Sequence, residues 1–172
     1  MDSKDDKLAR GDEQALLGEL GAMIESARGR AAVAVNSGLV MLYWDVGKRV
    51  RNHVLEGKRA EYGRAVVKRV AAALTVRYGR GYGQRNLERM VRFAEVWPDA
   101  EIASTLSTQL SWSHFTELLL IREPVSRDFY AAFAANERWS VRTLRAKVVG
   151  KLYKRTIAAR SSVDGLTGVH ST

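Results

Sequence analysis

Cysteine is absent from this chain of 172 residues, and proline occurs only twice, at positions 98 and 124. Without cysteine there is no disulfide and no thiolate metal site, so we expect a protein of the reducing cytoplasm. No uncharged apolar run approaches the roughly 20 residues of a membrane-spanning helix, and residues 1–10 are charged rather than apolar. Secretion and membrane insertion are therefore not expected.

Acidic residues are missing from two stretches, residues 62–87 and 138–163. The whole chain has 28 Lys and Arg against 19 Asp and Glu, a net charge of +9, and these stretches carry much of the excess. The first contains Arg64, Lys68, Arg69, Arg77, Arg80 and Arg85, and the second contains Arg138, Arg142, Arg145, Lys147, Lys151, Lys154, Arg155 and Arg160. Basic blocks of this kind are typical of proteins that contact a polyanion, most often nucleic acid.

Apolar residues recur at three- and four-residue spacing over nearly all of residues 12–154, and no convincing period-2 run occurs. The pattern predicts an all-α protein, a helical bundle with a helix-turn-helix-like core. We expect three parts: a flexible N-terminal lead over 1–11, one helical DNA-binding domain over 12–156, and a disordered tail over 157–172.

The longest predicted helix runs from residue 31 to residue 54, after a first helix that begins near Asp12 and weakens across 26–30. Its expected core stripe consists of Val35, Leu39, Tyr43, Val46, Val50 and Val54, broadened by Leu42 and Trp44. Asn36 and Asp45 lie near this stripe. For each of them we expect a hydrogen bond at the edge of the core, not a catalytic role.

Residues 61–97 give the strongest functional signal, a basic helix, a glycine-rich turn and a second helix. Val67, Val70, Ala71, Leu74 and Tyr78 form one apolar face of the first helix. Three glycines within five residues, at 79, 81 and 83, predict a sharp turn, and Pro98 ends the second helix. Leu87, Met90, Val91, Ala94 and Trp97 fall on one side of that helix, with Arg85, Arg89 and Arg92 opposite.

The first turn of the second helix carries Gln84, Arg85 and Asn86, whose side chains can form paired hydrogen bonds to base edges in a major groove. We therefore predict that this helix contacts DNA through its polar and basic side chains. The basic side chains of the preceding helix and of the turn are predicted to contact DNA as well. The first group is Gln84, Arg85, Asn86, Arg89 and Arg92, and the second is Arg64, Lys68, Arg69, Arg77 and Arg80. The alternative is an ordinary solvated face, with an ion pair between Glu88 and Arg92.

Four further helices are expected: residues 100–106, a helix capped by Ser111 or Ser113 that stops before Pro124, residues 126–135, and a last helix capped by Ser140. The helix before Pro124 could form a second helix-turn-helix, but its rich apolar face favours packing. Trp112 is expected to anchor the core. His114 and Glu117 could share a helix face, yet one such pair is not a metal site, so neither metal nor cofactor is predicted.

Five separated pieces of the run from residue 36 to residue 155 occur in the order of one known family: residues 39–40, 42–45 and 47–48; 62–63; 81–82 with 85–87 and Met90; 110–114; and 129–130 followed by 139–140 and Leu144. Through these pieces the run resembles the N-terminal domain of the YhcG family. The resemblance implies a helix-turn-helix-like, DNA-binding front domain, which full-length members continue into a PD-(D/E)xK nuclease domain. Gly83 departs from the family, because many relatives have a capping Ser there.

The carboxylate and lysine pattern of that nuclease is not found in this chain: Asp164 is the only acidic residue after Arg155, and no strand pattern follows it. We therefore expect a non-enzymatic module that binds double-stranded DNA, either standing alone or truncated from a YhcG-like nuclease. The alternative is a protein-interaction module that docks on a separate partner, such as a nuclease subunit. The sequence also leaves open whether the chain forms a homo-oligomer.

Overall fold

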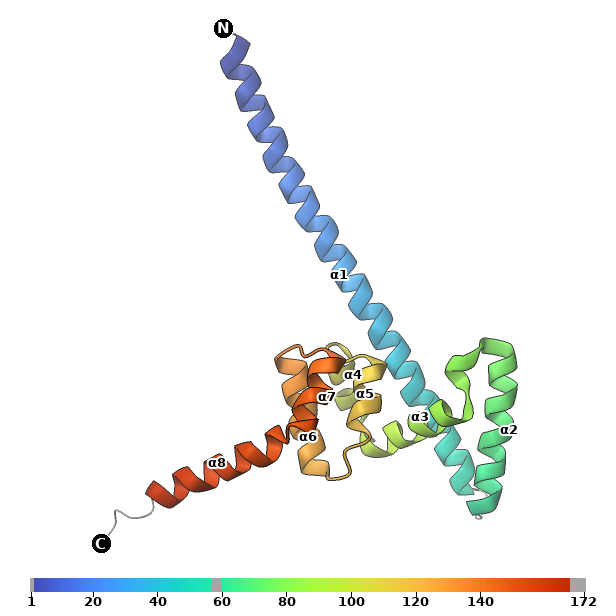
Figure 1. Ribbon diagram of the computed structural model, residues 1–172. Helices are drawn as coiled ribbons and strands as arrows, with labels where there is room; N and C mark the ends of the chain where they lie inside the picture. The colour runs from blue at the N-terminus through green and yellow to red at the C-terminus, as the bar shows by residue number, and fades with distance from the viewer. Residues whose placement is uncertain (1, 57–59, 168–172) are drawn as a thin grey trace.

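The computed structural model describes the backbone of residues 2–56 and 60–167, and the side chains of residues 13–55 and 61–162. This part of the chain is helical and contains no β-strand (Figure 1). Its elements are α1 (Asp2–Glu56), α2 (Ala60–Tyr78), the 3-10 turn η1 (Arg80–Tyr82), α3 (Gln84–Val96), α4 (Ala100–Ser107), α5 (Trp112–Leu118), α6 (Pro124–Asn136), α7 (Val141–Val149) and α8 (Leu152–Thr167). The prediction of an all-α bundle is confirmed.

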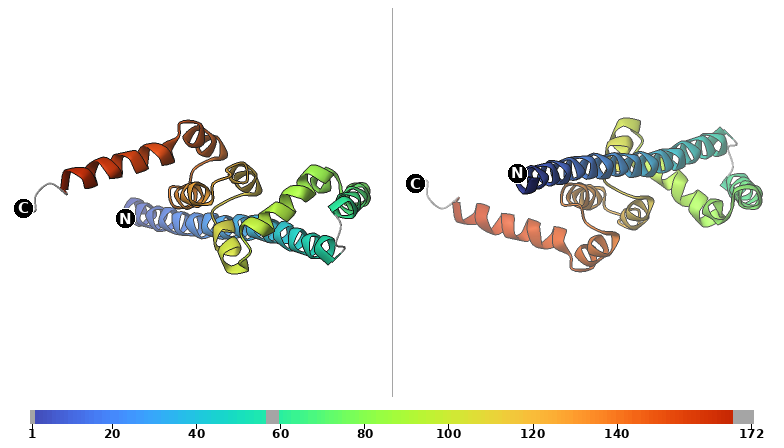
Figure 2. Two further views of the ribbon diagram at one scale, coloured as in Figure 1. Left: turned by 90° about the horizontal axis from the view of Figure 1, so that it is seen from below. Right: turned by 90° about the horizontal axis from the view of Figure 1, so that it is seen from above.

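Helix α1 is one continuous helix of 55 residues, and the other helices gather around its C-terminal half (Figure 1). Helices α2 and α3 lie at one end of the molecule, and α8 extends away from the bundle at the other (Figure 2). The sequence pattern had divided α1 into a flexible lead over 1–11 and two helices. Helix instead covers 2–11 and crosses 26–30 without a break, because no proline interrupts the segment.

The core face of α1 differs from the predicted stripe. Tyr43 and Trp44 are buried as predicted, but Val35 is 74%, Leu39 43% and Leu42 45% exposed. Val40, which lies outside the predicted stripe, is fully buried. The reason is the crossing of α1 and α3, which touch more extensively than any other pair of helices. They meet at Gly47, where an added methyl group would overlap the backbone carbonyl of Met90. The rotation of α1 is thus set by a close backbone approach.

Two apolar clusters form the core. The larger joins α1, α3, α4, α5, α6 and α7, and the smaller joins α1, α2 and α3. Trp112 packs against both clusters, and its ring lies 5.5 Å from the ring of Phe93 and 5.0 Å from that of Tyr43. The prediction that Trp112 anchors the core is confirmed. Phe93, which the helical pattern had not singled out, is fully buried at the centre of these contacts.

The basic helix, the turn and the second helix occur where the sequence predicted them. Helix α2 ends at Tyr78, and Gly79 has a φ of 95°, a conformation that favours glycine. Helix α3 begins at Gln84 and ends at Val96, just before Pro98. Tyr78, predicted to lie on the apolar face of this helix, is exposed at the helix end, and its ring packs edge-on against that of Tyr82, with centroids 6.0 Å apart.

The C-terminal helices also follow their predicted caps. Ser111 and His114 form a reciprocal cap at the start of α5, and the Ser140 hydroxyl accepts a hydrogen bond from the Thr143 backbone nitrogen at 3.1 Å. The last predicted helix, however, is broken between α7 and α8, where Lys151 has a φ of 53°. Helix α8 then continues over 157–167, which the composition had assigned to a disordered tail; residues 168–172 lie outside the described part of the chain.

Two polar residues of α1 were predicted to form hydrogen bonds at the edge of the core. Asn36 does so: its Nδ2 donates to the carbonyls of Ser107 at 2.8 Å and Leu110 at 3.0 Å, which ties α1 to the end of α4. Asp45 is exposed, so that prediction is wrong. Among the described helices none is long and apolar enough to cross a bilayer.

Candidate nucleic-acid interface

The outward face of α3 carries three arginines in a narrow sector. At about 100° per residue, Arg85, Arg89 and Arg92 fall within roughly 60° of one another, opposite the buried Leu87 and Met90. Arg85 and Arg92 are exposed and Arg89 is half-buried. The structure therefore brings these three predicted residues together on one surface.

A hollow of about 270 Å³ separates this arginine face from α5. Its α3 side consists of Arg85, Glu88, Arg89 and Arg92, and its α5 side consists of Thr116, Leu119 and Leu120. The arginines thus form one wall of an open groove with an apolar opposite wall. The sequence could not predict this groove, because it depends on how α5 packs beside α3.

Ion pairs reduce the charge of the arginine face unevenly. Arg92 lies 3.5 Å from Glu95, which also lies 3.7 Å from Arg51 of α1. The predicted pair between Glu88 and Arg92 is not observed, because the Glu88 carboxylate instead accepts a hydrogen bond from Gln84 Nε2 at 2.9 Å. Among the described residues Arg85 and Arg89 form no salt bridge, whereas Arg92 does.

Asn86 lies differently from its neighbours. Its Nδ2 donates a hydrogen bond to the Gly81 carbonyl, and its Oδ1 accepts one from Trp112 Nε1 at 2.9 Å. The carboxamide therefore faces the protein and links the glycine turn to α5. Asn86 is half-buried, and its side chain holds the start of α3 in place instead of pointing into solvent.

The basic residues of α2 and the turn are exposed but do not share one face. Helical rotation places Arg64 and Lys68 about 40° apart, Arg69 about 100° beyond Lys68, and Arg77 a further 80° or so around the helix. The Arg77 guanidinium lies 5.9 Å from the centre of the Tyr78 ring. Arg80, in η1, is also exposed. Arg64 and Lys68 thus form the one compact pair among the five predicted residues of this segment.

An ion pair that the sequence did not predict joins α5 to α7. The Arg145 guanidinium of α7 donates a hydrogen bond to the Glu117 carboxylate of α5, 28 positions away in the sequence. This hydrogen bond, together with the charges of Arg145 and Arg89, lowers the pKa of Glu117 against the opposing effect of burial. The charges of Arg89 and Arg145 therefore both act on this carboxylate. No local periodicity signals the contact.

Both ring nitrogens of His114 form hydrogen bonds within the protein. Its Nδ1 accepts hydrogen bonds from the backbone nitrogen of Ser111 at 3.1 Å and the Ser111 hydroxyl at 2.8 Å, which leaves Nε2 to donate to the Trp139 carbonyl at 2.7 Å. The imidazole is thus a structural link between α5 and the start of α7. In the part of the chain that is described, no three His, Asp or Glu side chains gather as a metal site would require.

Comparison with known proteins decides the family. The family model described as the DUF1016 N-terminal domain matches residues 19–155, which include all of α2 to α7. The chain belongs to the DUF1016 N-terminal domain family. The predicted resemblance to the front domain of the YhcG family is therefore confirmed.

One curated relative places this DUF1016 N-terminal domain within a longer protein. The chain is 27% identical over 165 residues to the Escherichia coli K12 protein named "Putative nuclease YhcG". The alignment covers 78% of this chain and 44% of that relative, so the chain spans less than half of its length. The comparison with solved structures gives no significant match.

Proposed function

We propose that this DUF1016 N-terminal domain is a non-catalytic module that binds double-stranded DNA, with α3 in the major groove. The observation that carries the proposal is the arginine face of α3, where Arg85 and Arg89 are free of salt bridges among the described residues. The order of helix α2, glycine turn and helix α3 matches the order of elements in a helix-turn-helix, whose second helix reads base edges near its N-terminus. The relative named as a nuclease supports a nucleic-acid partner.

The residues of α3 would have different roles. Arg85, in the first turn, is placed to form a bidentate hydrogen bond with a guanine edge, while Arg89 and Arg92 follow one and two turns later. Gln84 would reach a base only after releasing Glu88. Asn86 would fix the start of the helix and take no direct part in reading, because both ends of its carboxamide are bonded within the protein.

The basic residues before α3 would contact phosphates. Arg64 and Lys68 form the compact pair on α2 and are the strongest candidates, since phosphate contacts require only an exposed cation within reach of the backbone. Arg69, Arg77 and Arg80 would add charge around them. Contacts of this kind make affinity depend on salt and act on all sequences alike. We also propose that the protein acts in the cytoplasm, which its lack of cysteine suits.

A gel-shift titration of the purified chain with duplex DNA at two salt concentrations tests the proposal. Binding should weaken as salt rises, with a slope of about 0.9 for each phosphate contact. Incubation of the same preparation with plasmid DNA and Mg²⁺ or Mn²⁺ tests the non-catalytic part. Absence of salt-dependent binding would refute DNA recognition, and cleavage that exceeds a mock-purified control would refute the non-catalytic assignment.

The groove also favours a second candidate, a module that docks on a separate protein such as a nuclease subunit. Leu120 is 70% exposed at the apolar wall of the hollow, next to the arginines of α3. An apolar lip beside basic side chains suits an acidic peptide with one apolar anchor. Under this alternative, replacement of Leu120 by Ser would abolish partner binding, whereas duplex DNA would not bind at either salt concentration.

A further inference from the structure

The N-terminal part of α1 projects beyond the bundle as a single helix (Figure 1). From Glu13 to Val35 every residue is exposed except the half-buried Gly21. An isolated helix gains little stability from propensity alone and normally depends on packing of an apolar face. This segment has such a face, and the rest of the described structure leaves that face exposed.

The apolar face of this segment has large side chains at one end and small ones at the other. Leu16, Leu17, Leu20, Met23 and Ile24 are between 45% and 67% exposed, and Ala27, Ala31 and Ala34 follow on the same side of the helix. Spacings of three and four residues make this a stripe of the kind that packs against a second helix. Single exposed apolar residues are ordinary, but a continuous stripe marks an interaction surface.

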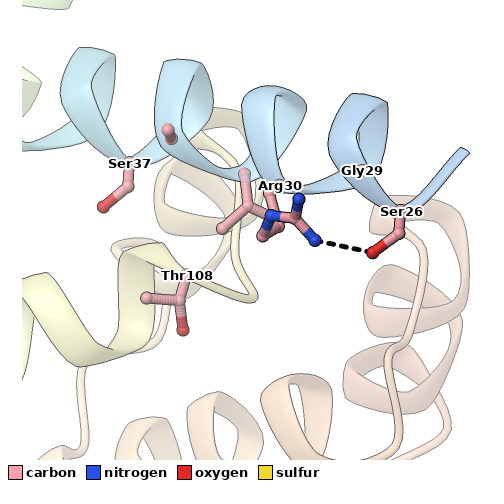
Figure 3. Close-up of a pocket in the computed structure, with 7 residues that line it drawn as sticks. Ser26, Gly29, Arg30, Ser37 and Thr108 are labelled. Atoms are coloured by element: carbon pink, nitrogen blue, oxygen red, sulfur yellow. Dashed lines mark hydrogen bonds between the residues drawn. The ribbon is translucent and has the colours of Figure 1, made fainter. Parts of the chain in front are cut away.

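Two shallow hollows flank the stripe on the side of α1 that carries Arg30. A groove of about 520 Å³ runs along Gly29, Arg30, Val33 and Ala34 to Thr108 at the end of α4 (Figure 3). A second hollow, of about 470 Å³, continues it past Met23 and shares Ser26 and Arg30 with it. The stripe borders these hollows at Met23, Ala27 and Ala34.

We propose that this stripe binds the same stripe of a second copy of the chain in an antiparallel pair, centred between Met23 and Ile24. In that arrangement the large side chains of each copy lie over the small side chains of the other. Leu20 comes level with the partner's Ala27, and Leu16 comes level with the partner's Ala31. Large against small allows the two helices to interdigitate, as packed cores require.

Charge complementarity favours the same orientation. The large end of the stripe carries Glu13 and Glu19, and the small end carries Arg30, whose guanidinium is bonded only to the Ser26 hydroxyl, at 2.6 Å, in the described structure. Antiparallel pairing places Arg30 between the partner's Glu13 and the partner's Glu19. A parallel pair in register would instead place glutamate opposite glutamate and arginine opposite arginine, and would stack large side chains on large ones.

The mass of the protein in solution, measured by light scattering across a range of concentrations, tests the pairing with matched variants. Ala27→Glu places a charge at the centre of the stripe, and Ala32→Glu places the same charge about 140° around the helix. Both positions lie outside the bundle, so circular dichroism should remain unchanged. We expect dimers for the parent and Ala32→Glu and monomers for Ala27→Glu. A monomeric parent, or an Ala27→Glu variant that still dimerises, would overturn the proposal.

The orientation has its own test, which the cysteine-free sequence makes simple. Under mild oxidation Met23→Cys should form a disulfide-linked dimer, since the two positions lie next to the symmetry axis. Ala34→Cys should not, because an antiparallel pair separates those positions by about 30 Å, far beyond disulfide reach. A crosslink at 34 as efficient as that at 23 would show a parallel pair and overturn the arrangement.

Discussion

The Asn86 carboxamide and the Trp112 indole are joined by a hydrogen bond of 2.9 Å, in which Trp112 Nε1 donates to Asn86 Oδ1. The other end of the carboxamide donates to the Gly81 carbonyl, so one side chain connects the turn, the first turn of α3 and the start of α5. The Trp112 ring also lies between the two apolar clusters. This link fixes where the arginine face of α3 stands relative to α5.

Asn86→Ala should lower the free energy of unfolding by about 1–3 kcal/mol, because the indole nitrogen and the Gly81 carbonyl both lose their partner. Urea unfolding followed by circular dichroism measures the change. Gln84→Ala is the matched control, since Gln84 is exposed and bonds only Glu88 nearby; its effect should be within about 0.5 kcal/mol. If Asn86→Ala has unchanged stability but an altered DNA sequence preference, Asn86 contacts a base directly.

Two glycines of α1 should respond oppositely to replacement by alanine. Gly47→Ala would push a methyl group into the Met90 carbonyl and force α1 and α3 apart, with an expected cost of about 1–3 kcal/mol or more. Gly38→Ala meets no atom within 4 Å and should stabilise the helix by about 0.5–1 kcal/mol. Thermal unfolding of both variants measures the contrast. Equal shifts would show that the helix crossing is looser than described.

Acid should weaken the contact between α5 and α7. The Arg145 hydrogen bond lowers the pKa of Glu117 in the folded protein, so the folded state binds this proton less readily than the unfolded chain. The resulting stabilisation is present above the unfolded pKa, about 4.3, and is lost as pH falls through the lower folded value. Glu117→Gln and Arg145→Met should therefore be less stable than the parent at neutral pH, with the difference shrinking near pH 3. Urea titrations at both pH values measure this, and a constant difference would contradict it.

Arg85→Ala and Lys68→Ala should impair DNA binding in different ways. Loss of a bidentate base contact by Arg85 should cost about 1–3 kcal/mol and relax the preference at one position of the site. Loss of a phosphate contact by Lys68 should weaken all sequences alike and lower the salt slope by about 0.9. Affinity, salt slope and sequence preference are measured for both, with helicity as the folding control. If both variants bind like the parent at low and high salt, the basic faces are only solvated.

Much of the local structure could be predicted from the sequence. The spacing of Leu87, Met90 and Ala94 defined the buried side of α3, and with it the outward sector of Arg85, Arg89 and Arg92. Gly79 and Pro98 marked the ends of α2 and α3, because their backbone restrictions act within a few residues. The caps at Ser111 and Ser140 were likewise local.

Only the tertiary structure decided which surfaces meet. The rotation of α1, which buries Val40 and exposes Val35, depends on the approach of Gly47 to Met90, 43 positions further along the chain. The groove beside the α3 arginines, the pair between Glu117 and Arg145 and the inward turn of Asn86 depend in the same way on neighbours distant in sequence. Periodicity reports which side of a helix is apolar. It carries no information on which partner covers that side, because packing free energy arises between segments and not within them.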